Sequence, residues 1–303
     1  MPTRIDIPTA TSAGMSNHEE MQRLKAEIWA SDYVPPALRR RRDRGKRQLA
    51  ALPKIVAEGD SWFAYPVGLD VLDQLRANWG YSIERVASAG DTLENMVYGT
   101  KLRRDFTRKP AGLVEVLDKI RQQRPEVVLF SGGGNDVAGD ELLRYLNHAS
   151  APSSAGGTRW LREDVWNEAL AQMEASLRVF AQAVWAVAPK LPILMHGYAN
   201  PVPDGRAVLN FPFGFKFFGP WMRLAFAGKG YTDWRKTEPW VGRLLGDYNR
   251  MLAGVAADSG GRFIYVDVRK AVGRDDWANE LHPTNAGFKA VATVIHRALE
   301  KLP

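Results

Sequence analysis

The chain has 303 residues, of which 45% are hydrophobic and 25% charged, the composition of an ordinary globular protein. It contains no cysteine, which excludes disulfides, thiolate metal sites and a cysteine nucleophile. The net charge of +7 is uneven, because residues 1–53 hold ten basic against six acidic side chains. The positive balance therefore belongs largely to the N-terminal segment and says little about the rest of the chain.

Residues 1–53 are predicted to form a basic N-terminal extension, with a short helix over 18–31 that Pro35-Pro36 ends. The run from Arg39 to Arg47 would suit an anionic partner. A solvated helix or linker is the alternative, because no aromatic residue interleaves the arginines. Residues 1–21 lack the apolar core of a secretory signal, and no run of about 18 apolar residues could span a membrane. We therefore expect a cytoplasmic protein without a transmembrane segment, with signal-independent export still open.

From residue 54 onward, short apolar runs alternate with segments of helical period. The predicted strands are 54–58, 82–87, 126–131, 192–196 and 262–267, rich in Val and Ile as in a buried parallel sheet. The predicted helices include 68–78, 112–123, 162–187, 241–257 and 284–301. This alternation predicts one α/β domain over 54–303, with a doubly wound, mostly parallel five-stranded sheet flanked by helices. Ligands bind beyond the carboxyl ends of the strands in such sheets.

The connection over residues 201–240 is far longer than usual between a strand and a helix. It carries ten aromatic residues, and its phenylalanines at 211–217 alternate with Pro, Gly and Lys as in an extended segment with one apolar face. We predict a lid-like insertion in which Phe213 and Phe215 bind the substrate. A small subdomain that packs its own aromatic residues is the alternative.

Short polar motifs lie just beyond the predicted strands or beside the last helix. Ser61 follows the first strand, and a serine nucleophile needs a base and donors for the oxyanion it creates. Asn135 offers an amide donor, and Gly90 can turn its backbone N–H toward a substrate oxygen. Of the five histidines, His282 is the best general base, because Pro283 and a helix start hold it in place.

His196 ends the fourth predicted strand at the same edge of the sheet. It would either contact the substrate or be a buried, hydrogen-bonded histidine, and the sequence leaves both open. No group of histidine and acidic residues has the spacing of metal ligands, so neither a metal nor another cofactor is expected.

Taken in order, these motifs resemble those of the SGNH/GDSL hydrolase superfamily over about residues 54–301. The matching positions are Gly59-Asp60-Ser61, Gly90, Gly133-Gly134-Asn135-Asp136 and His282. The resemblance implies a serine esterase or lipase-like enzyme in which Ser61 attacks an ester carbonyl and His282 takes its proton. It also implies an oxyanion bound by the backbone N–H groups of Ser61 and Gly90 and by the Asn135 amide. The aromatic insertion favours a small or lipid-like ester with an apolar acyl part, and removal of acetyl groups from a carbohydrate is the alternative.

The chain departs from the superfamily at one position. The family usually has aspartate three residues before the histidine, where this chain has Asn279. An amide oxygen can accept the Nδ1–H and orient the ring, but it stabilises an imidazolium less than a carboxylate does. We expect Asn279 to orient His282, with Glu280 and Asp276 as alternatives. The same departure keeps open a non-catalytic binding protein on this fold.

Overall fold

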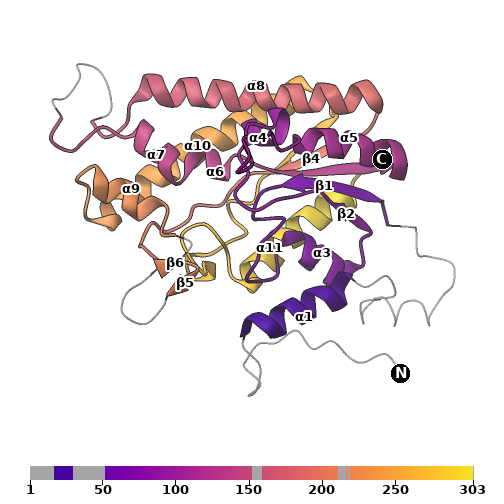
Figure 1. Cartoon of the computed structure of the whole chain (residues 1–303), viewed down its shortest axis with the longest axis horizontal. Coiled ribbons are helices and arrows are strands. Elements are labelled where there is room, and N and C mark those ends of the chain that lie inside the picture. Colours follow the sequence, from indigo (N-terminus) through magenta and orange to yellow (C-terminus); the bar gives the residue numbers. More distant parts are fainter. Residues whose placement is uncertain (1–16, 30–51, 152–158, 211–215, 218, 303) are drawn as a thin grey trace.

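The structure is a computed structural model, and it describes residues 17–29, 52–151, 159–210, 216–217 and 219–302. Its centre is a five-stranded, all-parallel sheet in the order β2-β1-β3-β4-β7 (Figure 1). The strands are β1 (Ile55–Gly59), β2 (Ile83–Arg85), β3 (Val127–Ser131), β4 (Ile193–His196) and β7 (Phe263–Val266). Each strand lies within two residues of its predicted bounds. This order is the flavodoxin-like arrangement of a doubly wound sheet, so the predicted fold class is confirmed.

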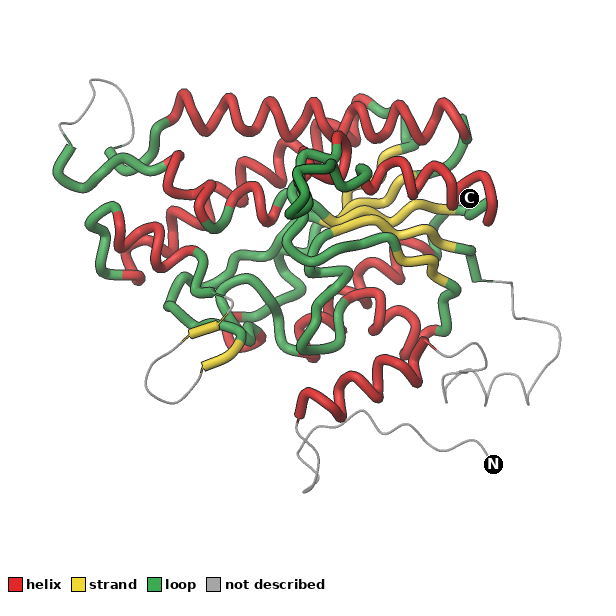
Figure 2. Tube along the Cα trace, in the orientation of Figure 1, coloured by secondary structure: helices red, strands yellow, loops and turns green. Residues whose placement is uncertain are grey.

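Helices cover both faces of the sheet (Figure 1). One side carries α4 (Leu93–Tyr98), α5 (Gly112–Gln123), α8 (Glu163–Val187) and α10 (Trp234–Asp258), and the other carries α3 (Val71–Trp79) and α11 (Asn285–Leu299). Every residue of β1, β3 and β4 is buried between these layers. Figure 2 shows that the loops that follow the strands gather at one end of the sheet, where the polar motifs lie.

Helix α10 begins seven residues before its predicted start at 241, so that predicted boundary was wrong. Asp233 caps the helix, and its carboxylate accepts the backbone N–H of Arg235 at 3.1 Å. Pro239 lies inside the helix, where it lacks the N–H of a helical hydrogen bond and normally ends a helix. Packing of α10 against α8 and β7 compensates for that loss, and such packing cannot be seen in the local sequence.

The insertion at 201–240 is not a single loop. Its described residues include a two-stranded hairpin, β5 (Leu209–Asn210) with β6 (Lys216–Phe217), then α9 (Met222–Gly228) and the first turns of α10. Phe226 is completely buried, and Trp240 stacks on Trp160 with ring centroids 4.8 Å apart. Phe226 belongs to the main hydrophobic core and Trp240 packs against it, so these aromatic residues join the core of the whole domain. Phe213 and Phe215, like the run from Arg39 to Arg47, lie outside the described residues.

Helix α1 (Asn17–Trp29) packs against α3 through a cluster of buried charges. Nζ of Lys25 lies 2.9 Å from the carboxylate of Asp73 and 3.4 Å from that of Asp70, and both aspartates are fully buried. Arg85 contacts the same two carboxylates at 2.8 and 3.1 Å, and Nε1 of Trp29 donates to Asp73 at 2.6 Å. Buried charges are tolerated only when they are paired, so α1 completes a cluster that α3 and β2 do not satisfy alone.

Replacing Lys25 by methionine is expected to destabilise the protein by about 1–3 kcal/mol, because two buried carboxylates then share one arginine. The free energy of urea unfolding measures this loss. Arg23→Met on the same helix is the matched control, since its pair with Glu27 is exposed and such pairs contribute less than about 1 kcal/mol. Equal losses in the two variants would show that the buried charges do not hold α1.

Candidate active site

Three side chains predicted to act together lie in contact beyond the carboxyl ends of the strands. Ser61 follows β1, and its Oγ lies 2.7 Å from Nε2 of His282. Nδ1 of the same ring lies 2.9 Å from Oδ1 of Asn279. That oxygen also accepts the backbone N–H groups of Leu281 and His282, both at 3.0 Å. It therefore faces the ring as an acceptor, from which we assign the proton to Nδ1 and the acceptor role toward Ser61 to Nε2.

The turn after β1 is held by the buried carboxylate of Asp60. Oδ1 accepts the backbone N–H of Trp62 at 2.9 Å and the hydroxyl of Ser131 at 2.8 Å, and Oδ2 accepts the hydroxyl of Tyr198. Nε1 of Trp62 donates to the backbone carbonyl of Leu281 at 2.9 Å, across 219 positions of sequence. The bond from Trp62 to Leu281 fastens the turn that carries the serine to the turn that carries the histidine.

Tyr65 is a residue of this site that the sequence did not reveal. Its ring stacks on His282, with centroids 4.4 Å apart and 21° between the planes. Its hydroxyl oxygen accepts Nδ2–H of Asn279 at 3.1 Å. Tyr65 thus touches both the imidazole and the residue that accepts from it. Its position four residues after Ser61 is the single sequence signal, and that spacing does not distinguish it from a core aromatic residue.

Glu280 and Asp276, the alternatives to Asn279, are engaged elsewhere. Glu280 is fully buried, and its carboxylate accepts backbone N–H groups from Gly205 and from residues 221–223 at 2.7 to 3.1 Å. The carboxylate of Asp276 accepts the backbone N–H of Gly273 at 3.0 Å. Glu280 therefore ties the start of α9 to the histidine turn, and Asn279 is the one of the three that contacts the His282 ring.

Burial lowers the pKa of His282 to about 3. The side chain is 4% exposed, and its partner Asn279 carries no charge that would favour the imidazolium. The ring is therefore neutral near neutral pH, which is the form able to take a proton from Ser61.

Changing Asn279 to aspartate is expected to raise the pKa of His282 by about one to three units, because a carboxylate beside the ring favours its charged form. The acidic limb of kcat/KM reports the pKa of the catalytic base in the free enzyme. In the wild type we expect no such limb between about pH 8 and pH 5, since the folded pKa lies below this window. In Asn279→Asp the limb should move upward.

The matched control for this change is Glu280→Gln, which alters a carboxylate that does not touch the ring. Its pH profile should keep the wild-type shape even if its stability falls. An acidic limb that is the same in the wild type and in Asn279→Asp would contradict the assignment of Asn279 to Nδ1.

The two further groups predicted to bind an oxyanion lie on neighbouring loops. Gly90 has a φ of +76°, a left-handed conformation that favours glycine. Nδ2 of Asn135 donates to the carbonyl oxygen of Asp91 at 2.8 Å, which joins the Gly90 loop to helix α6 (Gly134–Val137). Among the described residues, no acceptor takes the second hydrogen of this amide. One N–H of the Asn135 amide is thus bound to Asp91, and the other is available to donate to a ligand.

A small pocket opens at Ser61 and Asn135, with a volume of about 30 Å³. This is room for about two water molecules. Most of its other lining residues are apolar or aromatic: Trp62, Val137, Tyr198, Ala199, Pro201, Met222, Leu245, Trp277 and Leu281.

His196 does not line this pocket, so the predicted contact with substrate is wrong. It is completely buried, with its ring stacked on Trp62 at a centroid distance of 5.3 Å and its Nδ1 2.7 Å from the carbonyl oxygen of Gly197. Strand β4 ends inside the core, behind the aromatic residues that form the pocket wall. The alternative of a buried, hydrogen-bonded histidine is the one that the structure supports.

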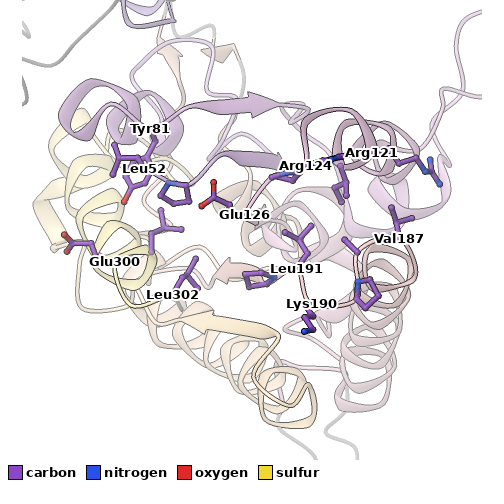
Figure 3. Close-up of a pocket in the computed structure, with 17 residues that line it drawn as sticks. Leu52, Tyr81, Arg121, Arg124, Glu126, Val187, Lys190, Leu191, Glu300 and Leu302 are labelled. Carbon is purple, nitrogen blue, oxygen red and sulfur yellow. The ribbon is translucent and has the colours of Figure 1, made fainter. Parts of the chain in front are cut away.

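A larger groove, of about 1280 Å³, lies at the opposite end of the sheet, next to the amino ends of the strands (Figure 3). Pro53, Pro125 and Pro192 line it, and they lie one or two residues before β1, β3 and β4. Its described lining residues include neither serine nor histidine, so the groove has no nucleophile and base of the kind found at Ser61.

Two further kinds of site are absent from the part of the chain that the structure describes. No three histidine, aspartate or glutamate side chains there gather closely enough to hold a metal ion. None of the described helices combines the length and the apolar character needed to cross a bilayer.

Comparison with known proteins gives distant similarities to solved structures. No protein-family model matches the chain, and no curated protein matches its sequence. TesA is 18% identical, with a TM-score of 0.44, over 82% of this chain and 99% of that one. The extracellular lipase of Streptomyces rimosus is 15% identical, with a TM-score of 0.45, over 81% of this chain and 99% of that one. The family 3 carbohydrate esterase of Clostridium thermocellum is 15% identical, with a TM-score of 0.45, over 82% of this chain and 98% of that one.

Proposed function

We propose that this chain is a serine esterase of the SGNH/GDSL type, which hydrolyses carboxylic esters with Ser61 as the nucleophile. The observation that carries the proposal is the unbroken series of contacts from Ser61 Oγ to His282 at 2.7 Å and from His282 to Asn279 at 2.9 Å. A serine hydroxyl needs a base in contact with it, and the base needs a group that orients it. Both are present at the edge of the sheet where ligands of such folds bind.

In the first half of the proposed reaction, Oγ of Ser61 attacks the ester carbonyl carbon while Nε2 of His282 takes the hydroxyl proton. The carbonyl oxygen becomes an oxyanion, which would accept from the backbone N–H groups of Ser61 and Gly90 and from the Asn135 amide. When the tetrahedral intermediate collapses, His282 returns the proton to the leaving alkoxide. Water then attacks the acyl-serine by the same route and releases the acid.

The pocket limits the size and polarity of the acyl group that this esterase could accept. Its apolar lining favours an apolar acyl group, and its volume of about 30 Å³ favours a short one. The small volume also favours a second candidate, an esterase that removes acetyl groups from a carbohydrate. In that case the sugar would lie outside the pocket and only the acetyl group would enter it.

A series of p-nitrophenyl esters of increasing acyl length, run on the wild type and on Ser61→Ala, tests the proposal. We expect turnover of the acetyl and propionyl esters that Ser61→Ala lacks, with a decline for long chains. Acetylated sugars should be compared in the same assay, and kcat/KM higher for them than for all aryl esters would favour the carbohydrate candidate. Binding of esters without any turnover would instead support a non-catalytic protein.

Met222→Ala is expected to shift the preferred acyl chain to a longer one. Met222 lines the pocket and is 3% exposed, so its truncation should add room beside the acyl group. Each CH₂ that the enlarged pocket buries is worth about 0.8 kcal/mol, or about fourfold in kcat/KM. Met173→Ala on α8 makes the same truncation in the core away from the pocket, and its chain-length profile should match the wild type. Identical profiles for all three proteins would mean that Met222 does not limit acyl length.

A further inference from the structure

The segment between α4 and α5 is an ordered hairpin on the surface of the protein. A β-bridge joins Leu102 to Arg108, and backbone hydrogen bonds run from Arg103 to Thr107 at 2.8 Å and from Lys109 to Lys101 at 3.0 Å. We call residues 101–109 the basic hairpin. All of its residues are exposed.

Large apolar side chains are concentrated on and beside the basic hairpin. Six such side chains are strongly exposed in the described part of the chain, and three of them lie here: Tyr98 at 49%, Leu102 at 59% and Phe106 at 83%. Phe106 also has a φ of +62°, a left-handed conformation that is unfavourable by about 1 kcal/mol for a residue with a side chain. Neither backbone preference nor packing within the described chain accounts for an aromatic ring held in this position.

Positive charge surrounds these apolar side chains. The basic hairpin contains Lys101, Arg103, Arg104, Arg108 and Lys109, against the single acid Asp105. The Asp105 carboxylate accepts the backbone N–H and the hydroxyl of Thr107 at 3.0 and 2.6 Å. Within the described ranges, none of the three arginines forms an ion pair. Their charges are therefore available to an external anionic surface.

The basic hairpin borders the candidate active site. Nζ of Lys101 donates to the carbonyl oxygen of Gly90 at 2.8 Å and to the carboxylate of Asp91 at 2.5 Å. The Asp91 carbonyl in turn accepts from the Asn135 amide. A surface that bound the hairpin would thus lie beside the loop expected to contribute to the oxyanion hole.

We propose that the basic hairpin docks the protein on a lipid surface that carries anionic headgroups. Apolar side chains that enter the interface, ringed by arginine and lysine, are the combination that binds such surfaces. Nucleic acid would also attract the cations, but single-strand binding relies on successive aromatic rings that stack on bases. One of the two apolar side chains in the hairpin is the aliphatic Leu102, which offers no such platform. The combination favours the lipid surface.

Flotation of the full-length protein with vesicles tests this proposal. One set of vesicles is phosphatidylcholine alone, and the other is two parts phosphatidylcholine to one part phosphatidylglycerol. We expect binding to the second set, weakened by salt. Arg103→Glu/Arg104→Glu should lower the partition coefficient by about tenfold or more. Leu102→Ser/Phe106→Ser should lower it by about fivefold, because it removes apolar area from the interface.

The matched control is Arg121→Glu/Lys190→Glu, which makes the same change in net charge at the groove on the opposite end of the sheet (Figure 3). It should bind vesicles within about twofold of the wild type. If this control loses as much vesicle binding as the hairpin charge reversal does, net charge alone explains the effect and the proposal is overturned. Absence of wild-type binding would overturn it as well.

Two further outcomes assign the binding to something else. If replacing the arginines at 39–42 by serine abolishes binding while the hairpin variants bind normally, the N-terminal run is the lipid site and the proposal is wrong. If a single-stranded oligonucleotide binds at the hairpin and Leu102→Ser/Phe106→Ser leaves vesicle binding unchanged, the hairpin is a polyanion site. Urea midpoints equal to the wild type show that each variant is folded.

Discussion

Replacing Ser61 by alanine is expected to lower kcat for a p-nitrophenyl ester by about four orders of magnitude or more. The reason is geometric: the Ser61 hydroxyl is 2.7 Å from a histidine whose other nitrogen is held by Asn279. Without Oγ no acyl-enzyme can form, and the buried imidazole has nothing to activate. His282→Ala should cause a loss of similar size, because the two residues act as a unit and their effects are not additive.

A fluorophosphonate probe gives an independent readout, since it labels an activated serine covalently. Mass spectrometry should find the label on Ser61 and find none in Ser61→Ala. Ser82→Ala, at an exposed serine before β2, is the matched control and should retain both label and turnover. Labelling of Ser61→Ala at the wild-type yield would contradict the assignment of Ser61 as the nucleophile.

Replacing Asn135 by alanine is expected to lower kcat by about 10²–10³ with little change in KM. The amide of Asn135 is fixed by its bond to Asp91 at 2.8 Å and lines the pocket beside Ser61. A donor fixed in this way stabilises charge that develops in the transition state, whereas the ground-state carbonyl gains little from it. Steady-state kinetics on a short-chain ester separate the two parameters.

Asn200→Ala is the matched control for this prediction. Asn200 lies just beyond β4 at the same end of the sheet, and it is exposed and does not line the pocket. Its removal should change kcat by no more than about twofold. If Asn135→Ala instead raises KM and leaves kcat unchanged, Asn135 binds the ground state and the oxyanion is stabilised by other groups.

The sheet could be predicted because the relevant signals are local. Each strand is a run of consecutive apolar residues, which burial on both faces of a parallel sheet requires. The ends of parallel strands meet at one edge, so Ser61 and Asn135 were placed on the same edge from sequence order alone. Helix α10 shows where local signals are insufficient, because the predicted helix began at 241 whereas the observed one begins at Trp234 and contains Pro239.

The partners of individual side chains were decided by tertiary structure. Asn279 and Glu280 are neighbours, and each has an oxygen that could accept from His282. The Glu280 carboxylate does not contact the ring, because it accepts backbone N–H groups from Gly205 and from residues 221–223. No local sequence pattern connects those residues to Glu280. His196 ends a strand at the ligand edge as predicted, but Trp62 covers it, so its burial depends on a residue more than a hundred positions away.

The sequence by itself determined which chemical groups this protein has and at which strand ends they stand. The spacing of apolar residues along a segment predicts whether it is a helix or a strand and which of its faces is buried. This signal comes from residues that are close together in the chain. The tertiary structure alone decided that Tyr65 lies against His282, and it decided among Asn279, Glu280 and Asp276 as the partner of Nδ1. The Tyr65 contact joins segments more than two hundred residues apart, and the choice of Asn279 depends on the distant N–H groups that engage Glu280. Such geometry follows from how whole elements pack, which a local pattern does not encode.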